Sequence, residues 1–176
     1  ISVSENQTLA IDVNASDPEG TALVYALAGG ADQGRFSIDS STGVLTFKSP
    51  PDYEANASVA GDNAYAVTVE MTDGVSTVSQ SLVVNVANVN ETPGVLSGAV
   101  AVMAENLTVA LDVNGSDPDG TSPVYSLSGG ADAAAFSINA ATGILSFLSP
   151  PDYESPGSAA GNNAYALTVR ISDGAL

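Results

Sequence analysis

The sequence contains no cysteine, no histidine and no tryptophan among its 176 residues. Without cysteine it forms no disulfide or thiolate site, and without histidine it lacks the commonest general base and the usual zinc ligands. No run of about 18 apolar residues is present that would cross a membrane as a helix. We therefore expect a protein that is not an enzyme and does not insert into a membrane.

Basic residues are equally scarce, because 20 acidic residues face only three basic ones, Arg35, Lys48 and Arg170, and the net charge is −17. Such a chain has too few cations to neutralise phosphates, which argues against nucleic acid and against anionic membrane surfaces. An excess of negative charge this large repels itself and calls for salt, counter-cations or bound metal. In a secreted protein without disulfides, metal is one candidate stabiliser.

Self-similarity is the strongest feature that is present. A shift of 100 residues aligns the chain with itself without a gap, and about 43 of the 76 overlapping positions are identical, as in duplicated domains. The matching segments are Ser4–Gly20 with Ala104–Gly120, Ser49–Glu54 with Ser149–Glu154, and Gly61–Gly74 with Gly161–Gly174. We predict two repeats, residues 1–92 and 93–176. The chain opens in the middle of this pattern, so we interpret it as part of a longer protein, and the absence of a signal peptide carries no information.

Short alternating apolar segments separated by turn residues predict strands rather than helices. The expected strands of the first repeat are Leu9–Val13, Val24–Leu27, Phe36–Ile38, Val44–Phe47, Tyr65–Met71 and the longest, Thr77–Val86. Turn signals at intervals of roughly 8–12 residues and one apolar face per strand favour an all-β fold of two tandem β-sandwiches.

Both repeats are incomplete against the 100-residue period. The second has no counterpart of Thr77–Val86, its expected last strand, and the first has no counterpart of Gly94–Val100, part of its expected first strand. Either flanking sequence supplies these strands or a neighbouring chain does, since an uncovered strand edge needs a partner.

Acidic residues gather in short motifs near the expected strand ends, and the motifs recur. The first set is Glu5, Asp17 with Glu19, Asp52 with Glu54, and Asp73; the second is Glu105, Asp117 with Asp119, Asp152 with Glu154, and Asp173; Asn88, Asn90 and Glu91 lie between them. Aspartate and asparagine also occur in turns for conformational reasons alone. Recurrence of all four motifs favours oxygen ligands for calcium, which binds carboxylate, amide and carbonyl oxygens. We interpret the recurring Asp12, Asp112, Asp32 and Asp132 as solvent-facing or turn residues.

These motifs resemble those of the cadherin family in order and spacing. Ser4-Glu5-Asn6 is similar to x-E-N, Pro51-Asp52-Tyr53-Glu54 to L-D-R-E, and Asn88-Val-Asn-Glu-Thr-Pro93 to the linker D-x-N-D-N-x-P, more closely to its bacterial form D-V-N-E-A-P. Asp117-Pro-Asp119-Gly resembles D-x-D-x-G, and Ser172-Asp173-Gly174 resembles A-x-D-x-G. The resemblance covers nearly the whole chain, twice, and implies Greek-key sandwiches.

The resemblance also implies a set of metal ligands for one to three Ca²⁺ ions. These are Glu5, Asp52 and Glu54 from the first repeat, Asn88, Asn90 and Glu91 from the linker, and Asp117, Asp119 and Asp173 from the second repeat. Two departures reduce the expected number of ions: Asn88 stands where the family usually has aspartate, and the linker is one residue shorter than the vertebrate form.

The function expected from these features is a calcium-binding, rod-forming spacer or adhesion module of an extracellular, cell-surface repeat protein, of bacterial origin by its linker form. Its partners would be neighbouring repeats of the same chain, with identical chains or surface glycans left open. Two alternatives remain: a self-assembling fibre subunit that exchanges strands between chains, and a carbohydrate-binding module. The absence of tryptophan weighs against the second.

Overall fold

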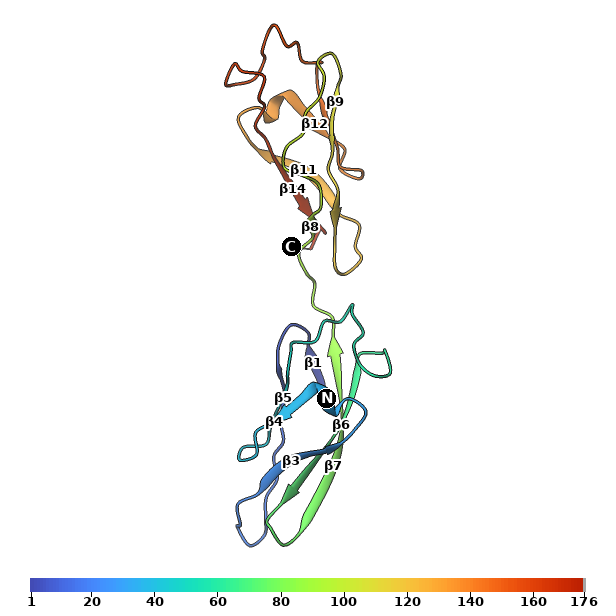
Figure 1. The fold of residues 1–176 in the computed structure, drawn as a ribbon, viewed down its shortest axis with the longest axis vertical. Helices are drawn as coiled ribbons and strands as arrows, with labels where there is room; N and C mark the ends of the chain where they lie inside the picture. The colour runs from blue at the N-terminus through green and yellow to red at the C-terminus, as the bar shows by residue number, and fades with distance from the viewer. Residues whose placement is uncertain (176) are drawn as a thin grey trace. The chain divides into compact units, whose positions relative to one another are not determined.

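The computed structural model describes residues 1–175, which form two compact units. Unit 1 comprises Ile1–Val89, and unit 2 begins at Asn90. Among the described residues, none of the helices is long and apolar enough to pass through a membrane. Each unit is an all-β sandwich, as the alternating apolar pattern predicts (Figure 1).

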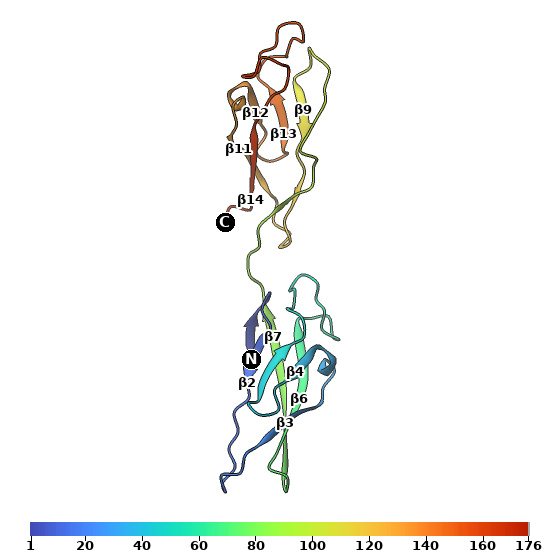
Figure 2. The ribbon, with the colours of Figure 1, turned by 60° about the vertical axis from the view of Figure 1, so that its left-hand side comes forward.

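Unit 1 has two sheets. The larger has four strands in the order β1 (Ser2–Ser4), β7 (Thr77–Ala87), β6 (Ala64–Thr72) and β3 (Val24–Gly29). The smaller has the order β2 (Leu9–Asp12), β5 (Val44–Phe47) and β4 (Phe36–Ile38), and a short 3-10 helix, η1 (Gln33–Arg35), precedes β4. β1 runs parallel to β7, whereas the other neighbouring strands are antiparallel. All six strands expected from the sequence are present. Figure 2 labels β2, β3, β4, β6 and β7 among them.

The core of unit 1 lies between its two sheets. Every second residue of β6 is buried, and β7 contributes Leu82, Val84 and Val86 to the same cluster. Phe36 and Leu45 of the smaller sheet are completely buried against them. The alternation of apolar residues that predicted these strands is thus the alternation of the side chains that are buried in the core.

Unit 2 repeats part of this arrangement. One sheet has the order β12 (Phe136–Ile138), β13 (Ile144–Phe147) and β9 (Val109–Asp112), and a second pairs β11 (Val124–Gly129) with β14 (Thr168–Ser172). A third pair joins β8 (Gly94–Val95) to β10 (Gly115–Ser116), and η2 (Ala133–Ala135) precedes β12.

The two units differ most where β7 lies in unit 1. β6 has nine residues and is paired on both edges, whereas β14 has five and is paired only with β11 among the described residues. Residues 102–104, which correspond to β1, are not in a strand. A strand is held by hydrogen bonds to its neighbours. The similar sequence around β14 therefore forms a shorter strand than β6, because it is paired on one edge alone in the described part of unit 2.

Candidate functional site

Three of the predicted ligands meet in unit 1. Glu5 directly follows β1, while Asp52 and Glu54 lie in the turn that follows β5. One carboxylate oxygen from each lies within 4.8 Å of the others. At that separation two negative charges repel by roughly 3 kcal/mol at an effective dielectric of 20, and by less where water screens them. The cluster is therefore electrostatically unfavourable unless a cation joins it.

Glu5 is the most buried member of this cluster, with 3% of its surface exposed. Its Oε1 accepts a hydrogen bond from the Val89 N–H at 2.8 Å, and its Oε2 accepts one from the Tyr53 N–H at 2.7 Å. One carboxylate thus holds the acidic turn and the beginning of the linker together. Each of its oxygens keeps a second lone pair, which a cation can use.

A second group forms in unit 2 around the turn Asp117–Gly120. The Asp119 N–H donates to Asp117 Oδ1 at 2.9 Å, and the Gly120 N–H donates to the Asp117 carbonyl at 3.1 Å. Gly120 has a φ of +75°, the left-handed conformation that this turn requires of its last residue. The turn therefore holds the Asp117 carboxylate against the backbone N–H of Asp119.

Two oxygens of this turn have no hydrogen-bond donor. Asp117 Oδ2 and Asp119 Oδ1 are buried, and neither has a partner among residues 1–175. A buried charged oxygen that has left water without a partner is costly, so such atoms are normally paired or bound to a metal. A calcium ion bound to Asp117 Oδ2 and Asp119 Oδ1 would supply the missing partner.

Two linker residues belong to the same group. The Asn90 side-chain amide donates from Nδ2 to Asp173 Oδ2 at 2.6 Å, and the Glu91 N–H donates to Asp119 Oδ2 at 2.7 Å. Asp173 directly follows β14. Hydrogen bonds thus link five of the predicted ligands in unit 2, although the carboxylate groups that lie within 4.8 Å of one another in the described residues are those of Glu5 and Glu105. The five side chains carry carboxylate and amide oxygens of the kind that Ca²⁺ prefers.

The ninth predicted ligand, Asn88, directly follows β7 and is exposed. It is not part of the three-carboxylate cluster in unit 1.

The unit 1 cluster has a counterpart in unit 2. Carboxylate oxygens of Glu105, Asp152 and Glu154 lie within 4.8 Å of one another, and all three residues are exposed. Glu105 Oε2 accepts from the Tyr153 N–H at 2.8 Å, as Glu5 does from Tyr53. The motif thus folds the same way twice, but only Glu5 is buried.

Asp73 and Asp17 of unit 1 bind backbone N–H groups of their own turns. Asp73 Oδ1 accepts from the Ser76 N–H at 2.6 Å and the Val75 N–H at 2.7 Å, and these bonds hold the pKa of this carboxyl below its ordinary value. Asp17 accepts from the Thr21 N–H. The two carboxylates thus cap their own turns in unit 1.

Asp32 and Asp132, interpreted as solvent-facing or turn residues, do lie in turns beside a 3-10 helix, but neither faces solvent. They are 3% and 7% exposed, and each carboxylate accepts two backbone N–H groups. For Asp132 the donors are Ala159 and Ala166, and their bonds lower its pKa. The donors lie 27 and 34 residues further along the chain, so no local pattern predicts these bonds.

Known proteins resemble this chain in sequence. A family model described as "Cadherin domain" matches residues 1–89. Protocadherin Fat 2 of Rattus norvegicus is 31% identical over 166 residues, which cover 85% of this chain and 3% of that protein. Protocadherin-16 of Homo sapiens is 34% identical over 156 residues, covering 82% of this chain and 4% of that protein. The chain thus spans only a few per cent of the length of these relatives.

Solved structures show the same fold. Human Protocadherin-24 EC1-2 (Form II) has a TM-score of 0.62 and 20% identity, with 97% of this chain and 81% of that chain covered. Drosophila N-cadherin EC1-4 has a TM-score of 0.63 and 14% identity, with 97% of this chain and 43% of that chain covered. At these identities the likeness concerns the fold alone.

Proposed function

Because this chain belongs to the cadherin family, we propose that it is a calcium-binding, rod-forming segment of a larger extracellular adhesion protein. The observation that carries the proposal is the pair of buried oxygens, Asp117 Oδ2 and Asp119 Oδ1, that receive no hydrogen bond among the described residues. Side-chain cations are too few to neutralise such groups throughout the chain, because three basic residues face 20 acidic ones. Bound divalent ions supply the missing charge.

We assign the ligands to the nine residues that the sequence indicates. Glu5, Asp52 and Glu54 would contribute from unit 1, Asp117, Asp119 and Asp173 from unit 2, and Asn88, Asn90 and Glu91 from the linker. The hydrogen bonds of Val89 to Glu5 and of Asn90 to Asp173 support this assignment, because they anchor two consecutive linker residues to the two acidic groups. With a cation present, the carboxylates would attract a common charge instead of repelling one another.

The mechanism is mechanical. Ions shared by consecutive repeats would fix the linker and turn a jointed chain into a rod, and loss of the ions would free it. A rod holds an adhesive surface away from the cell or presents many weak sites together. Extracellular calcium modules bind with a Kd on the order of 10⁻⁴ to 10⁻³ M, and we expect this chain to bind Ca²⁺ in the same range.

Calorimetric titration with Ca²⁺, combined with small-angle scattering in calcium and in EDTA, tests this proposal. We expect the titration to show binding heat at millimolar or lower Ca²⁺ concentrations. The scattering should show a narrower distribution of molecular shapes in calcium than in EDTA. Asp117→Asn with Asp119→Asn should weaken binding at least tenfold, because the carboxylate charges are lost while an acceptor oxygen remains. The matched control is Asp12→Asn with Asp112→Asn, which removes the same charge from exposed positions. Equal affinities for the two double variants would refute the assignment.

The origin and the alternative functions have weaker support. A bacterial origin rests on the linker Asn88–Pro93 alone, and the relatives reported above are animal proteins. No observation favours a carbohydrate-binding module or a self-assembling fibre over the calcium-stiffened segment. Glycan-array binding would identify the first alternative, and calcium-dependent growth of oligomers the second.

A further inference from the structure

Unit 1 contains a small pocket with a volume of about 310 Å³. Its lining includes three buried residues, Phe47, Pro51 and Tyr65, and two exposed basic residues, Arg35 and Lys48. Arg35 ends η1, and Lys48 directly follows β5. The chain has three basic residues in all, and this pocket gathers two of them. Such a concentration of positive charge in an acidic protein favours an anion.

The backbone holds the two basic residues close together. The Lys48 Nζ donates to the Gly34 carbonyl at 2.9 Å, and the Lys48 N–H donates to the Arg35 carbonyl at 2.8 Å. Neither basic side chain forms an ion pair with a carboxylate among residues 1–175. Two positive charges at one pocket repel each other, and an anion between them would replace that repulsion by attraction.

The carboxylates nearest the pocket are engaged elsewhere. Asp52 is part of the lining, but its Oδ1 accepts from the Ala55 N–H at 2.9 Å, and the residue belongs to the three-carboxylate cluster of unit 1. Asp32 lies near Tyr65 and outside the lining, and each of its oxygens accepts a backbone N–H. Arg35 and Lys48 therefore remain available to a ligand.

The Tyr65 hydroxyl is a third polar group of this pocket. Tyr65 is 1% exposed, and its hydroxyl makes no hydrogen bond with residues 1–175. The Ala57 backbone approaches the hydroxyl without the geometry of a hydrogen bond, and Arg35 is close enough to act on it electrostatically. A buried O–H group that has no acceptor is costly, so a ligand that supplies one would be stabilised there.

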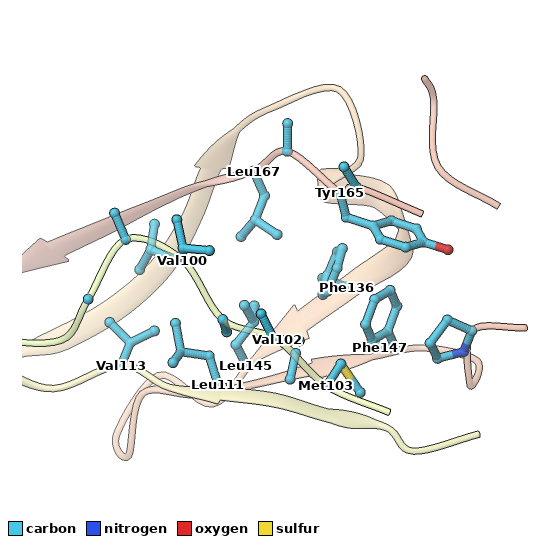
Figure 3. Close-up of a pocket in the computed structure, with 18 of the residues that line it drawn as sticks. Val100, Val102, Met103, Leu111, Val113, Phe136, Leu145, Phe147, Tyr165 and Leu167 are labelled. Carbon is cyan, nitrogen blue, oxygen red and sulfur yellow. The ribbon is translucent and has the colours of Figure 1, made fainter. Parts of the chain in front are cut away.

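The packing of the ring turns this hydroxyl away from the core. The Tyr65 ring lies edge-on to Phe47, with centroids 5.2 Å apart. The equivalent rings of unit 2, Tyr165 and Phe147, pack in the same way with centroids 4.8 Å apart. Figure 3 shows the Tyr165 hydroxyl pointing away from Leu167 and the other aliphatic side chains of the core.

The two repeats agree at the buried lining and differ at the cations. The buried residues recur 100 positions later as Phe147, Pro151 and Tyr165. Ala135 and Leu148 stand at the positions that correspond to Arg35 and Lys48. The neighbouring strands β12 and β13 nevertheless pair in the register of β4 and β5. The cations of unit 1 are therefore not required for the fold.

We propose that this pocket binds a small monocarboxylate that carries an apolar group. The lining contains two cations and one carboxylate, so its net charge of 2 − 1 = +1 matches a single negative charge better than a phosphate dianion. The Arg35 guanidinium can donate to both carboxylate oxygens, while the Lys48 amino group and the Tyr65 hydroxyl can each donate once more.

The rest of the lining fits the apolar part of such a ligand. Phe47, Pro50, Pro51, Ala55 and Ala57 offer it uncharged side chains. A volume of about 310 Å³ lies at the lower end of the range for ligand pockets, so the ligand is small. The proposal does not depend on calcium binding.

Benzoate is a suitable probe, because it joins one carboxylate to one apolar ring. The 176-residue chain is titrated in EDTA and followed by the amide NMR signals of Lys48 and Ala57 and by the side-chain N–H signal of Arg35. We expect saturable shifts with a Kd on the order of 1 mM. Benzamide has nearly the same shape without the charge and should bind at least about tenfold more weakly.

The matched variant is Arg35→Ala with Lys48→Leu, which gives unit 1 the residues that unit 2 carries and should therefore fold. It should weaken benzoate binding at least about 30-fold, because two charged donors are lost. Arg170→Ala removes the third basic residue, from β14, and should keep the Kd within about twofold. Tyr65→Phe should weaken binding about threefold to tenfold without lowering the Tm of the ligand-free chain, because its hydroxyl has no partner to lose.

Three results would overturn the proposal. One is the absence of saturable shifts at Lys48, Ala57 and Arg35 up to about 20 mM benzoate. Another is equal affinity for benzamide, which would show that the pocket recognises an apolar ring and no anion. The third is an unchanged Kd in the folded variant Arg35→Ala with Lys48→Leu, since the cations would then take no part.

Discussion

Replacement of Asp32 by asparagine tests whether a buried carboxylate organises unit 1 independently of any metal. Asp32 Oδ1 accepts from the Val59 N–H at 2.7 Å, and Oδ2 accepts from the Ala66 N–H at 2.8 Å. Asparagine has nearly the same shape, but one of its two terminal groups is an NH₂ that donates instead of accepting. One of the two backbone donors then faces another donor.

The expected loss follows from these two bonds. A hydrogen bond to a charged group contributes about 1.5–3 kcal/mol, and a buried donor left unpaired costs about 1–3 kcal/mol more. We therefore expect Asp32→Asn to lower the free energy of unfolding of unit 1 by about 3–5 kcal/mol. For a domain of this size, each kcal/mol corresponds to about 4–8 °C in Tm, so the Tm should fall by about 12 °C or more.

Thermal unfolding followed by the NMR signals of Val67 and Val69, two core residues of β6, reports on unit 1 alone. The measurement is made in EDTA so that no metal contributes. Asp12→Asn is the matched control, because it removes the same charge from an exposed position of β2. If both variants lower the Tm by the same few degrees, the carboxylate of Asp32 is not a structural support.

Three further predictions address the linker, the acid stability and the core. Chelation of calcium should accelerate amide exchange of Val89 at least tenfold, as measured by NMR, because Glu5, which accepts its N–H, is then repelled by Asp52 and Glu54. The amides that Asp132 binds lower its pKa in the folded state below the ordinary value of 3.8. Its contribution to stability is therefore complete above pH 3.8 and should disappear as the pH falls through the folded pKa. Acid titration followed by circular dichroism measures this loss. Val84→Ala should destabilise unit 1 by about 2–3 kcal/mol in urea unfolding, whereas Val83→Ala, on the exposed face of β7, should cost less than about 1 kcal/mol.

The strands were predictable because their information is local. Apolar residues alternate in Tyr65–Met71, and the structure buries the same alternate positions in β6. The corresponding segment of unit 2 shows the limit of that reasoning. Ala164–Leu167 has almost the same sequence as Ala64–Val67 but is not in a strand. Alternation gives a segment the capacity to pair, while a neighbouring strand decides whether it does.

The acidic motifs were recognisable from their recurrence, but their contacts were not. Glu5 accepts hydrogen bonds from residues 48 and 84 positions away, and such contacts depend on how β1 lies against β7. The sequence indicated a turn at Asp32 but not its burial, because its donors come from a distant loop and from β6. A pattern of residue types identifies oxygen ligands, whereas their burial depends on tertiary structure.

The contrast between Glu5 and Glu105 links the metal chemistry to strand placement. Both follow the same local turn rules, since each accepts the N–H of the tyrosine between the two other acids. Glu5 additionally accepts from Val89, which lies two residues beyond the end of β7, and it is buried. Glu105 is exposed, and no strand in the described part of unit 2 occupies the position of β7. In unit 1 the strand that completes the larger sheet therefore also delivers the linker amide that holds Glu5 in the acidic cluster.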